Sequence, residues 1–220
     1  MRTYCLEVWG DFACFTRPEM KTERVSYDII TPSAARAIFE SILWKPAIRW
    51  QITKIELLHP IKWISLRRNE ISNIISAKNA KSAMKNNKGF LHLYIEDERQ
   101  QRAGLFLRDV RYRIYAHFEI IEQSENNLPG KFFDMFERRA LKGQCINQPY
   151  LGCREFVANF ALIEDQSISS RLYNETRDLG WVLYDMDYSQ TDNPIPRFFH
   201  ANLNEGRLII PDWKSEEIKQ

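Results

Sequence analysis

The chain has 220 residues, of which 44% are hydrophobic and 27% are charged, and these proportions are ordinary for a soluble globular protein. This length is enough for one large domain, or for a medium domain with a small one. A formal net charge of +2 does not by itself indicate a nucleic-acid binder, so any positive charge that serves a partner has to be concentrated on one face.

The cysteines and the N-terminus exclude several classes of protein. None of the four cysteines belongs to a C-x-x-C pair, and together with the histidines they show no zinc-ligand spacing. We therefore expect reduced thiols at Cys5, Cys14, Cys145 and Cys153. The first residues show no cleavable signal pattern, and no apolar run reaches about 18 residues. A cytoplasmic location without membrane contact is the expectation.

The first elements are a strand, a helix and a second strand. Residues 3–9 alternate between apolar and polar side chains, which predicts a strand. Thr31 can cap a helix, Pro32 suits its first position, and Pro46 is expected to end it. Residues 47–58 are rich in β-branched and aromatic side chains and predict the second strand.

The block 61–110 is harder to interpret. Its lysines at positions 78, 81, 85 and 88 indicate a solvated loop more readily than a designed basic patch. We expect a strand at 90–96 and a polar turn at 97–102. A further strand is expected at about 111–121.

The last part alternates again between helix and strand. Phe132, Phe136 and Ala140 recur at helical spacing within 131–143, and Gly143 is a stop signal. Residues 153–163 predict a strand. The tail is expected to end in a hairpin that turns at residues 204–206.

Without the block 61–110, the order of elements is strand, helix, strand, strand, helix, strand. This α+β order is that of a ferredoxin-like fold, the βαββαβ arrangement of RNA-recognition domains. Such a sheet has helices on one face and leaves the other face free for bases and phosphates. The strand at 111–121 would be central in this sheet.

The strand YRIYAHFEI, residues 112–120, carries the candidate chemistry. Because a strand sends alternate side chains to opposite faces, its apolar residues form one face, and the other face holds Arg111, Arg113, Tyr115, His117 and Glu119. This second face could hold an anion, a flat base or only water. A structural role is the competing interpretation, since the arginines could pair with Glu119 or with acids of the next strand.

RNA can be cut without a metal ion when the 2′-hydroxyl attacks its own phosphate and the 5′-oxygen leaves. A histidine can act as base or acid near neutral pH, an arginine donates to phosphate, and a tyrosine can stack or give a proton. His117, Tyr115 and Arg113 are the candidate catalytic residues, although they span about 13 Å and cannot all touch one atom. The acidic runs 95–98 and 184–187 lack a third partner, so we expect no metal site.

Three longer stretches carry a resemblance to a known family. VWGDFACFTRPEMKTERVSYDIITPSAARAIFESILWKP, LRDVRYRIYAHFEI and PYLGCREF together resemble the Cas-five proteins of type I-C (d or c subtype), within the RAMP superfamily. The resemblance implies a ferredoxin-like domain over 1–166 with 61–110 as an inserted hairpin region, and a small antiparallel β domain over 167–220. It also implies a metal-independent endoribonuclease that cuts precursor CRISPR RNA within its repeats, without a cofactor. The protein would then stay on the 5′ tag within the interference complex.

Carried over residue by residue, the resemblance implies that His117 is the general acid or base. Relatives can place a lysine just before this histidine and a tyrosine just before Trp-Lys-Pro, where this chain has Ala116 and Leu43. The cation would then come from Arg113, Arg111 or Lys45. Candidate tag-binding residues in the loop after the first strand are Arg17, Arg24 and Tyr27.

The partners that follow are precursor and mature CRISPR RNA and the other subunits of the complex. Two alternatives stay open. The chain could be a binding and assembly subunit that does not cut, as the two departures from the family pattern suggest. Separately, the lysine-rich stretch 78–88 could bind double-stranded DNA.

Overall fold

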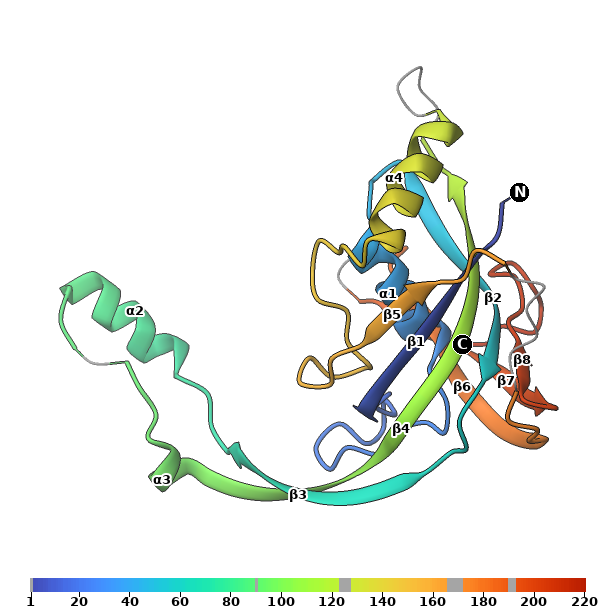
Figure 1. Cartoon of the computed structure of the whole chain (residues 1–220). Helices are drawn as coiled ribbons and strands as arrows, with labels where there is room; N and C mark the ends of the chain where they lie inside the picture. Colours follow the sequence, from blue (N-terminus) through green and yellow to red (C-terminus); the bar gives the residue numbers. More distant parts are fainter. Residues whose placement is uncertain (1, 90, 123–127, 166–171, 190–192) are drawn as a thin grey trace.

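Figure 1 shows the computed structural model, which describes the chain except for residues 1, 90, 123–127, 166–171 and 190–192. The helices are α1 (Pro32–Ile42), α2 (Ala77–Asn86), α3 (Ile95–Glu98) and α4 (Pro129–Leu141). The strands are β1 (Tyr4–Ala13), β2 (Ile48–Leu57), β3 (Trp63–Ile71), β4 (Arg99–Ile120), β5 (Asn159–Leu162), β6 (Arg177–Asp187), β7 (Ile195–Asn204) and β8 (Arg207–Ile209). The fold is mixed α/β, with few helices and a mostly antiparallel sheet.

The strands form one sheet of eight, in the order β5-β1-β4-β2-β8-β7-β6, and β3 pairs with β4 outside this path. β4 is antiparallel to β1 on one side and to β2 on the other. β8 pairs with β2 through residues 54–56, so the strands of the C-terminal part continue the same sheet. β4 therefore lies in the middle of the body of the protein.

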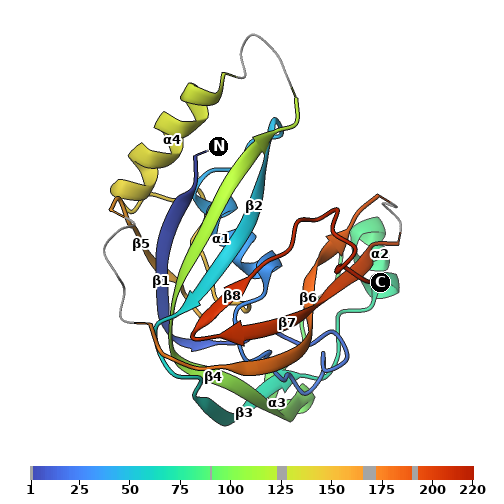
Figure 2. The same ribbon diagram turned by 90° about the vertical axis from the view of Figure 1, so that its right-hand side faces the viewer.

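The main core lies between the sheet and helices α1 and α4, which cover one face of β1, β4 and β2 (Figure 2). Ile114, Ala116 and Phe118 of β4 point into it, as their alternation predicted. Trp50 of β2 is at its centre, with its ring centroid 4.9 Å from that of Phe39. Each large apolar side chain buried in this way contributes about 1.5–3 kcal/mol.

Helix α1 begins as predicted and ends earlier than predicted. The Thr31 side chain accepts a hydrogen bond from the backbone N–H of Ala34, and Pro32 occupies the first turn. The helix ends at Ile42 because Leu43 adopts extended backbone angles, so Pro46 does not terminate it. The Leu43 carbonyl accepts a hydrogen bond from Trp50 Nε1 at 2.9 Å, which fixes this turn against the core.

Helix α4 confirms its prediction closely. Its buried residues are Phe132, Phe136 and Ala140, and Gly143 follows it with a φ of 64°. This left-handed conformation favours glycine, which explains the stop. Within the described part of the chain, no helix is long and apolar enough to cross a membrane.

The block 61–110 forms an arm that differs from its prediction. β3 pairs with the first half of β4, and α2 lies at the far end (Figure 1). The predicted loop at 77–86 is helical, because its alanines and lysines are good helix formers without an internal glycine or proline. The predicted turn at 97–102 is wrong, since residues 97–98 end the short helix α3 and residues 99–102 belong to β4. Of the strand predicted at 90–96, residue 90 lies outside the described residues, residues 91–94 form no regular element, and residues 95–96 begin α3.

The bounds of two other strands differ from the predicted ones. β1 continues four residues beyond the predicted strand, and β5 covers only the second half of the predicted 153–163. Residues 150–156 instead form bends and turns that pack against the end of β1. The hairpin between β7 and β8 is confirmed, with Glu205 and Gly206 both at positive φ, as a tight two-residue turn requires.

Candidate functional site

The polar face of β4 lies on the side of the sheet opposite to α1 and α4. Its side chains alternate with the core residues, as the sequence predicted. The neighbouring strands bring acids to it, because Glu7 of β1 and Glu56 of β2 both lie opposite Arg113. The polar face of β4 is therefore a network of paired charges.

Arg113 is held by Glu7. Its Nε lies 3.2 Å from Glu7 Oε2, and its side chain is only 9% exposed. Arg111 donates to the other oxygen of the same carboxylate, with Nε at 2.7 Å from Oε1, and its guanidinium also lies over the Trp9 ring. Arg111 is the more accessible of the two arginines, since 41% of its side chain is exposed.

Tyr115 is held by Glu56 and Lys54. The tyrosine hydroxyl donates to Glu56 Oε2 at 2.9 Å, and Lys54 Nζ lies 2.8 Å from the other oxygen. The same ammonium lies 3.7 Å from the centroid of the Tyr115 ring, a cation–π contact. Burial raises the pKa of Tyr115 well above its ordinary value, and the Glu56 carboxylate adds to this effect, so the phenol keeps its proton.

His117 is half-buried on the same face, where it lies opposite Gln51 of β2. Burial lowers the pKa of His117 below 6.5, and the nearby acids Glu119 and Asp212 only partly offset the effect. The imidazole is therefore mainly neutral at pH 7. No hydrogen bond to the ring comes from the described residues, so the ring nitrogens are free to meet a ligand.

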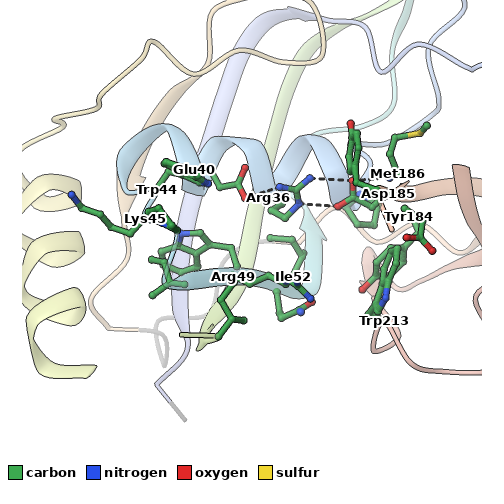
Figure 3. A pocket seen from close by; sticks show the side chains of 18 of the residues that line it. Arg36, Glu40, Trp44, Lys45, Arg49, Ile52, Tyr184, Asp185, Met186 and Trp213 are labelled. Carbon is green, nitrogen blue, oxygen red and sulfur yellow. Dashed lines mark hydrogen bonds and ion pairs between the residues drawn. The ribbon is translucent and has the colours of Figure 1, made fainter. Parts of the chain in front are cut away.

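A cleft of about 600 Å³ opens at the outer edge of β2, one strand away from His117, which does not line it. It lies between α1, the start of β2, the end of β6 and Trp213, and we call it the edge cleft (Figure 3). Gln51, the cross-strand partner of His117, is one of its lining residues, and so are Lys45 and Arg49. The predicted cation Lys45 therefore lines a cavity that extends to the cross-strand partner of the histidine.

The acids of the edge cleft are already paired. Arg36 donates to both oxygens of Asp185, at 2.8 and 3.0 Å, and to Glu40 at 2.6 Å. Asp187 lies 3.0 Å from Arg197. These contacts account for the acidic run 184–187, and the described residues contain no group of three or more possible metal ligands.

The candidates in the loop after β1 lie apart from His117. Arg17 lies over the Tyr27 ring at 4.5 Å, and Tyr27 is 2% exposed. Arg24 Nη1 lies 3.1 Å from the Cys153 sulfur, near Cys14. The hydrogen bond with Cys14 lowers the pKa of the Cys153 thiol, and the positive charge of Arg24 adds to this effect. Arg24 therefore belongs to a cluster with the two cysteines.

The sequence has relatives over nearly its whole length. The family model described as CRISPR-associated protein (Cas_Cas5) matches residues 3–210. The chain belongs to the Cas5d family. It is 50% identical to the CRISPR pre-crRNA endoribonuclease Cas5d of Mannheimia succiniciproducens, over 98% of this chain and 97% of the relative. It is 36% identical to the protein of the same name from Thermus thermophilus, over 97% and 93%.

Solved structures share the fold of this Cas5d-family chain. A crystal structure described as a CRISPR-associated protein matches with a TM-score of 0.71 at 20% identity, covering 100% of this chain and 97% of that one. A functionally uncharacterized protein from Streptococcus mutans matches with a TM-score of 0.67 at 22% identity and the same coverage. At these identities the likeness concerns the fold alone.

The two positions at which the resemblance implied a lysine and a tyrosine hold buried apolar residues in this Cas5d-family chain. Ala116 and Leu43 are both 0% exposed and belong to the main core. Neither side chain contributes a polar atom to the face around His117. The cations near that face include Arg111, Arg113, Lys54 and Arg207, whose Nε lies 3.8 Å from Glu56 Oε1, and those of the edge cleft.

Several residues of the site were missed by reading β4 alone. Glu7, Lys54 and Glu56 hold the predicted Arg113 and Tyr115, and they belong to strands distant in sequence. The available signal was the polar pair Lys54 and Glu56 between apolar neighbours. A β-bulge between Ile52 and Lys54 breaks the alternation of β2, so the face of these two residues could not be predicted from the spacing. Trp44 and Arg49 were visible beside Lys45, but nothing local indicates a cleft there.

The Glu56 carboxylate gives a stability prediction for this Cas5d-family chain. Replacing it in Glu56→Ala leaves the Tyr115 hydroxyl and the Lys54 ammonium without their buried partner, so we expect a loss of about 3 kcal/mol in the free energy of unfolding. Glu56→Gln, which keeps the size but not the charge, is expected to lose less. Urea denaturation measures both.

The matched control is Glu216→Ala, which removes an exposed glutamate and is expected to change stability by less than about 0.5 kcal/mol. A Glu56→Ala protein as stable as this control would show that the buried network contributes nothing to the fold.

Proposed function

We propose that this chain is an endoribonuclease that cuts precursor CRISPR RNA within its repeats. The observation that carries the proposal is that two relatives, 50% and 36% identical over nearly their full lengths, are both named CRISPR pre-crRNA endoribonuclease. The geometry around His117 supports it, because a half-buried imidazole without a hydrogen-bond partner among the described residues lies on the polar sheet face, one strand away from a cleft with basic residues.

We propose that the reaction needs no metal ion. His117 takes the proton of a 2′-hydroxyl, whose oxygen attacks the adjacent phosphorus, and the bond to the 5′-oxygen breaks. The leaving oxygen takes up a proton, and the products carry a 2′,3′-cyclic phosphate and a 5′-hydroxyl. The lowered pKa of His117 supports the role of base, since the neutral form that accepts a proton dominates at pH 7.

The other predicted residues take supporting roles in this proposal. Arg113 and Tyr115 position the strand through Glu7 and Glu56, and their contacts engage them before RNA arrives. Arg111 and Lys45 are the more exposed cations and suit phosphate binding. The deeply buried Tyr27 would support Arg17 rather than stack on a base.

We also propose a ferredoxin-like unit within the sheet. β1, α1, β2, β4, α4 and β5 follow the order strand, helix, strand, strand, helix, strand, and their strands lie side by side as β5-β1-β4-β2. In this proposal residues 1–166 form the RNA-binding unit with the arm inserted at 61–110, and residues 167–220 form a small β unit that extends the sheet.

The product stays bound in this proposal. The mature CRISPR RNA keeps its 5′ tag on the protein, with Arg17 and Arg24 as tag-binding candidates, and other subunits of the interference complex assemble around it. A specific observation favours a second candidate, a subunit that binds the tag without cutting. Tyr115 and Arg113 are tied to buried acids, and Ala116 and Leu43 supply no polar group.

Cleavage of the repeat RNA from the protein's own locus, in the presence of EDTA, tests the proposal. We expect one cut by the wild-type protein and a loss of at least about 100-fold in rate in His117→Ala, with RNA binding retained. His200→Ala is the matched control, because this histidine lies on β7 away from the site. Cleavage that EDTA abolishes contradicts the metal-free reaction, and binding without any cut supports the second candidate.

The pH dependence of the single-turnover rate tests the role of His117 as base. Burial lowers the pKa of His117 below 6.5. We therefore expect the titration of His117 to cause no change in the rate at pH 7 and above. Below that pKa the rate falls about tenfold per pH unit, because the protonated imidazole cannot accept the proton. A rate that instead falls as the pH rises through this range would assign His117 as the acid.

Double-stranded DNA is a further proposed ligand, on α2. Lys78, Lys81 and Lys85 of this exposed helix, with Lys88 just beyond it, offer positive charge at the far end of the arm. Replacing all four with glutamine is expected to reduce the slope of log affinity against log salt by about 3 to 4. His117→Ala is expected to leave this slope as it is, and an unchanged slope in the lysine variant would remove α2 from DNA binding.

A further inference from the structure

The edge cleft reaches Gln51, the cross-strand partner of His117, and the proposed reaction leaves its lining residues unexplained. We propose that it is the binding site for one unpaired nucleotide of the RNA, next to the phosphate that faces His117, with Trp44 stacked on the base and Lys45 and Arg49 on the flanking phosphates. The inference rests on the proposed function and names a part of the substrate that the site recognises.

The charge of the edge cleft favours an anion. Arg36 is paired with both Asp185 and Glu40, so this group of three side chains carries a net charge of −1. Lys45 and Arg49, in contrast, have no carboxylate within 4.0 Å among the described residues. With Arg197 counted beside Asp187, four cations meet three carboxylates, so the cleft has a net charge of +1. The two exposed cations without a carboxylate partner suit the sugar–phosphate backbone of a nucleic acid.

The aromatic residues of the edge cleft favour a flat base. Trp44 is 55% exposed, although tryptophan is among the most costly side chains to leave in water. No other aromatic ring of the described residues stacks on it, whereas Trp213 packs against Tyr184 at 5.6 Å and forms a fixed wall. A free indole at the mouth of a basic cleft is the kind of platform on which unpaired bases stack.

The backbone at the edge cleft is open as well. β2 pairs with β8 only through residues 54–56, so no described strand lies along its outer edge between Ile48 and Ile52. An open strand edge can also accept an extended peptide. The two unpaired cations decide between these ligands in favour of a polyanion, and a volume of about 600 Å³ is enough to enclose a nucleotide.

The position of the edge cleft places this nucleotide next to the reaction. Gln51 lines the cleft and lies directly opposite His117, one strand spacing of about 5 Å away. The C-terminal segment also links the two places. Trp213 lines the cleft, and the negative charge of the preceding Asp212 raises the pKa of His117. A strand of RNA that crosses β2 here can occupy the cleft and reach the imidazole at once.

The test uses the full chain and repeat RNAs in which 2-aminopurine replaces one base at a time along the whole repeat. A 2′-deoxy sugar at the mapped cut prevents cleavage. Stacking on an indole quenches 2-aminopurine, so we expect strong quenching at one position within two nucleotides of the cut. Trp44→Ala is expected to abolish this quenching and to weaken RNA binding roughly tenfold. Trp44→Phe, which keeps a ring, is expected to lose less.

The remaining variants separate the contributions of charge and ring. Lys45→Gln with Arg49→Gln is expected to lower the salt slope of RNA binding by about 1.4, or 0.7 for each lost phosphate contact on a single strand. Trp181→Ala is the matched control, since this β6 tryptophan is 51% exposed and does not line the cleft. It is expected to bind RNA as the wild type does.

The outcomes separate the two proposals. Quenching that depends on Trp44 in a protein that cuts nothing would overturn the proposed function and keep the nucleotide site. Normal cutting with no position that depends on Trp44 would overturn the inference and keep the function. Free nucleoside monophosphates that displace the RNA fully would show a mononucleotide site instead. Variants that bind RNA normally but fail to join partner subunits would assign the cleft to a peptide.

Discussion

The continuous pairing of β4 is the constraint on which the rest of the structure depends. This 22-residue strand is flanked by β1 and β2 in the body and by β3 in the arm, so both parts share one backbone. A buried strand must satisfy its N–H and C=O groups on both edges, and these ladders set which side chains face the helices and which face the other way. The place of His117 follows directly, because a slip of one residue would bury it in the core.

The second requirement is the balance of charge on the polar face. Burying Arg113 beneath a sheet surface is costly unless an acid meets it, and Glu7 does so from the neighbouring strand. Glu56 serves Tyr115 and Lys54 in the same way from the other side. These pairs make the centre of the face rigid and nearly neutral. The positive charge left for a ligand then lies around the rim, on Arg111 and in the edge cleft.

Much of the fold was predictable because its signals are local. The Thr31 cap, the helical spacing of Phe132 and Phe136 and the turn at Glu205 and Gly206 each depend on a few neighbouring residues. The arm was not predictable to the same degree. Helix α2 has no buried residue, so its sequence shows no apolar stripe that would predict a helix. The first half of β4 is polar because only β3 lies beside it. Its strand character comes from pairing across a gap in sequence.

The same distinction holds for the site. The alternation of residues 111–119 placed His117, Tyr115 and Arg113 on one face before the structure was known, and the structure agrees. What the alternation could not supply were the partners, since Glu7 and Glu56 lie more than 50 residues away from the residues that they hold. The edge cleft combines four separate parts of the chain, namely residues within 32–52, residue 121, residues 184–189 and residue 213, so its shape exists only in the folded chain.

The arm has one more consequence, which concerns its length. In its outer part β3 and β4 pair with each other and with no other strand. Two residues added to each strand, or removed from each, would leave every side chain on its present face and would move α2 by about 7 Å along the arm. The length of the arm can therefore change in steps of two residues per strand, by evolution or by design, without altering the residues around His117.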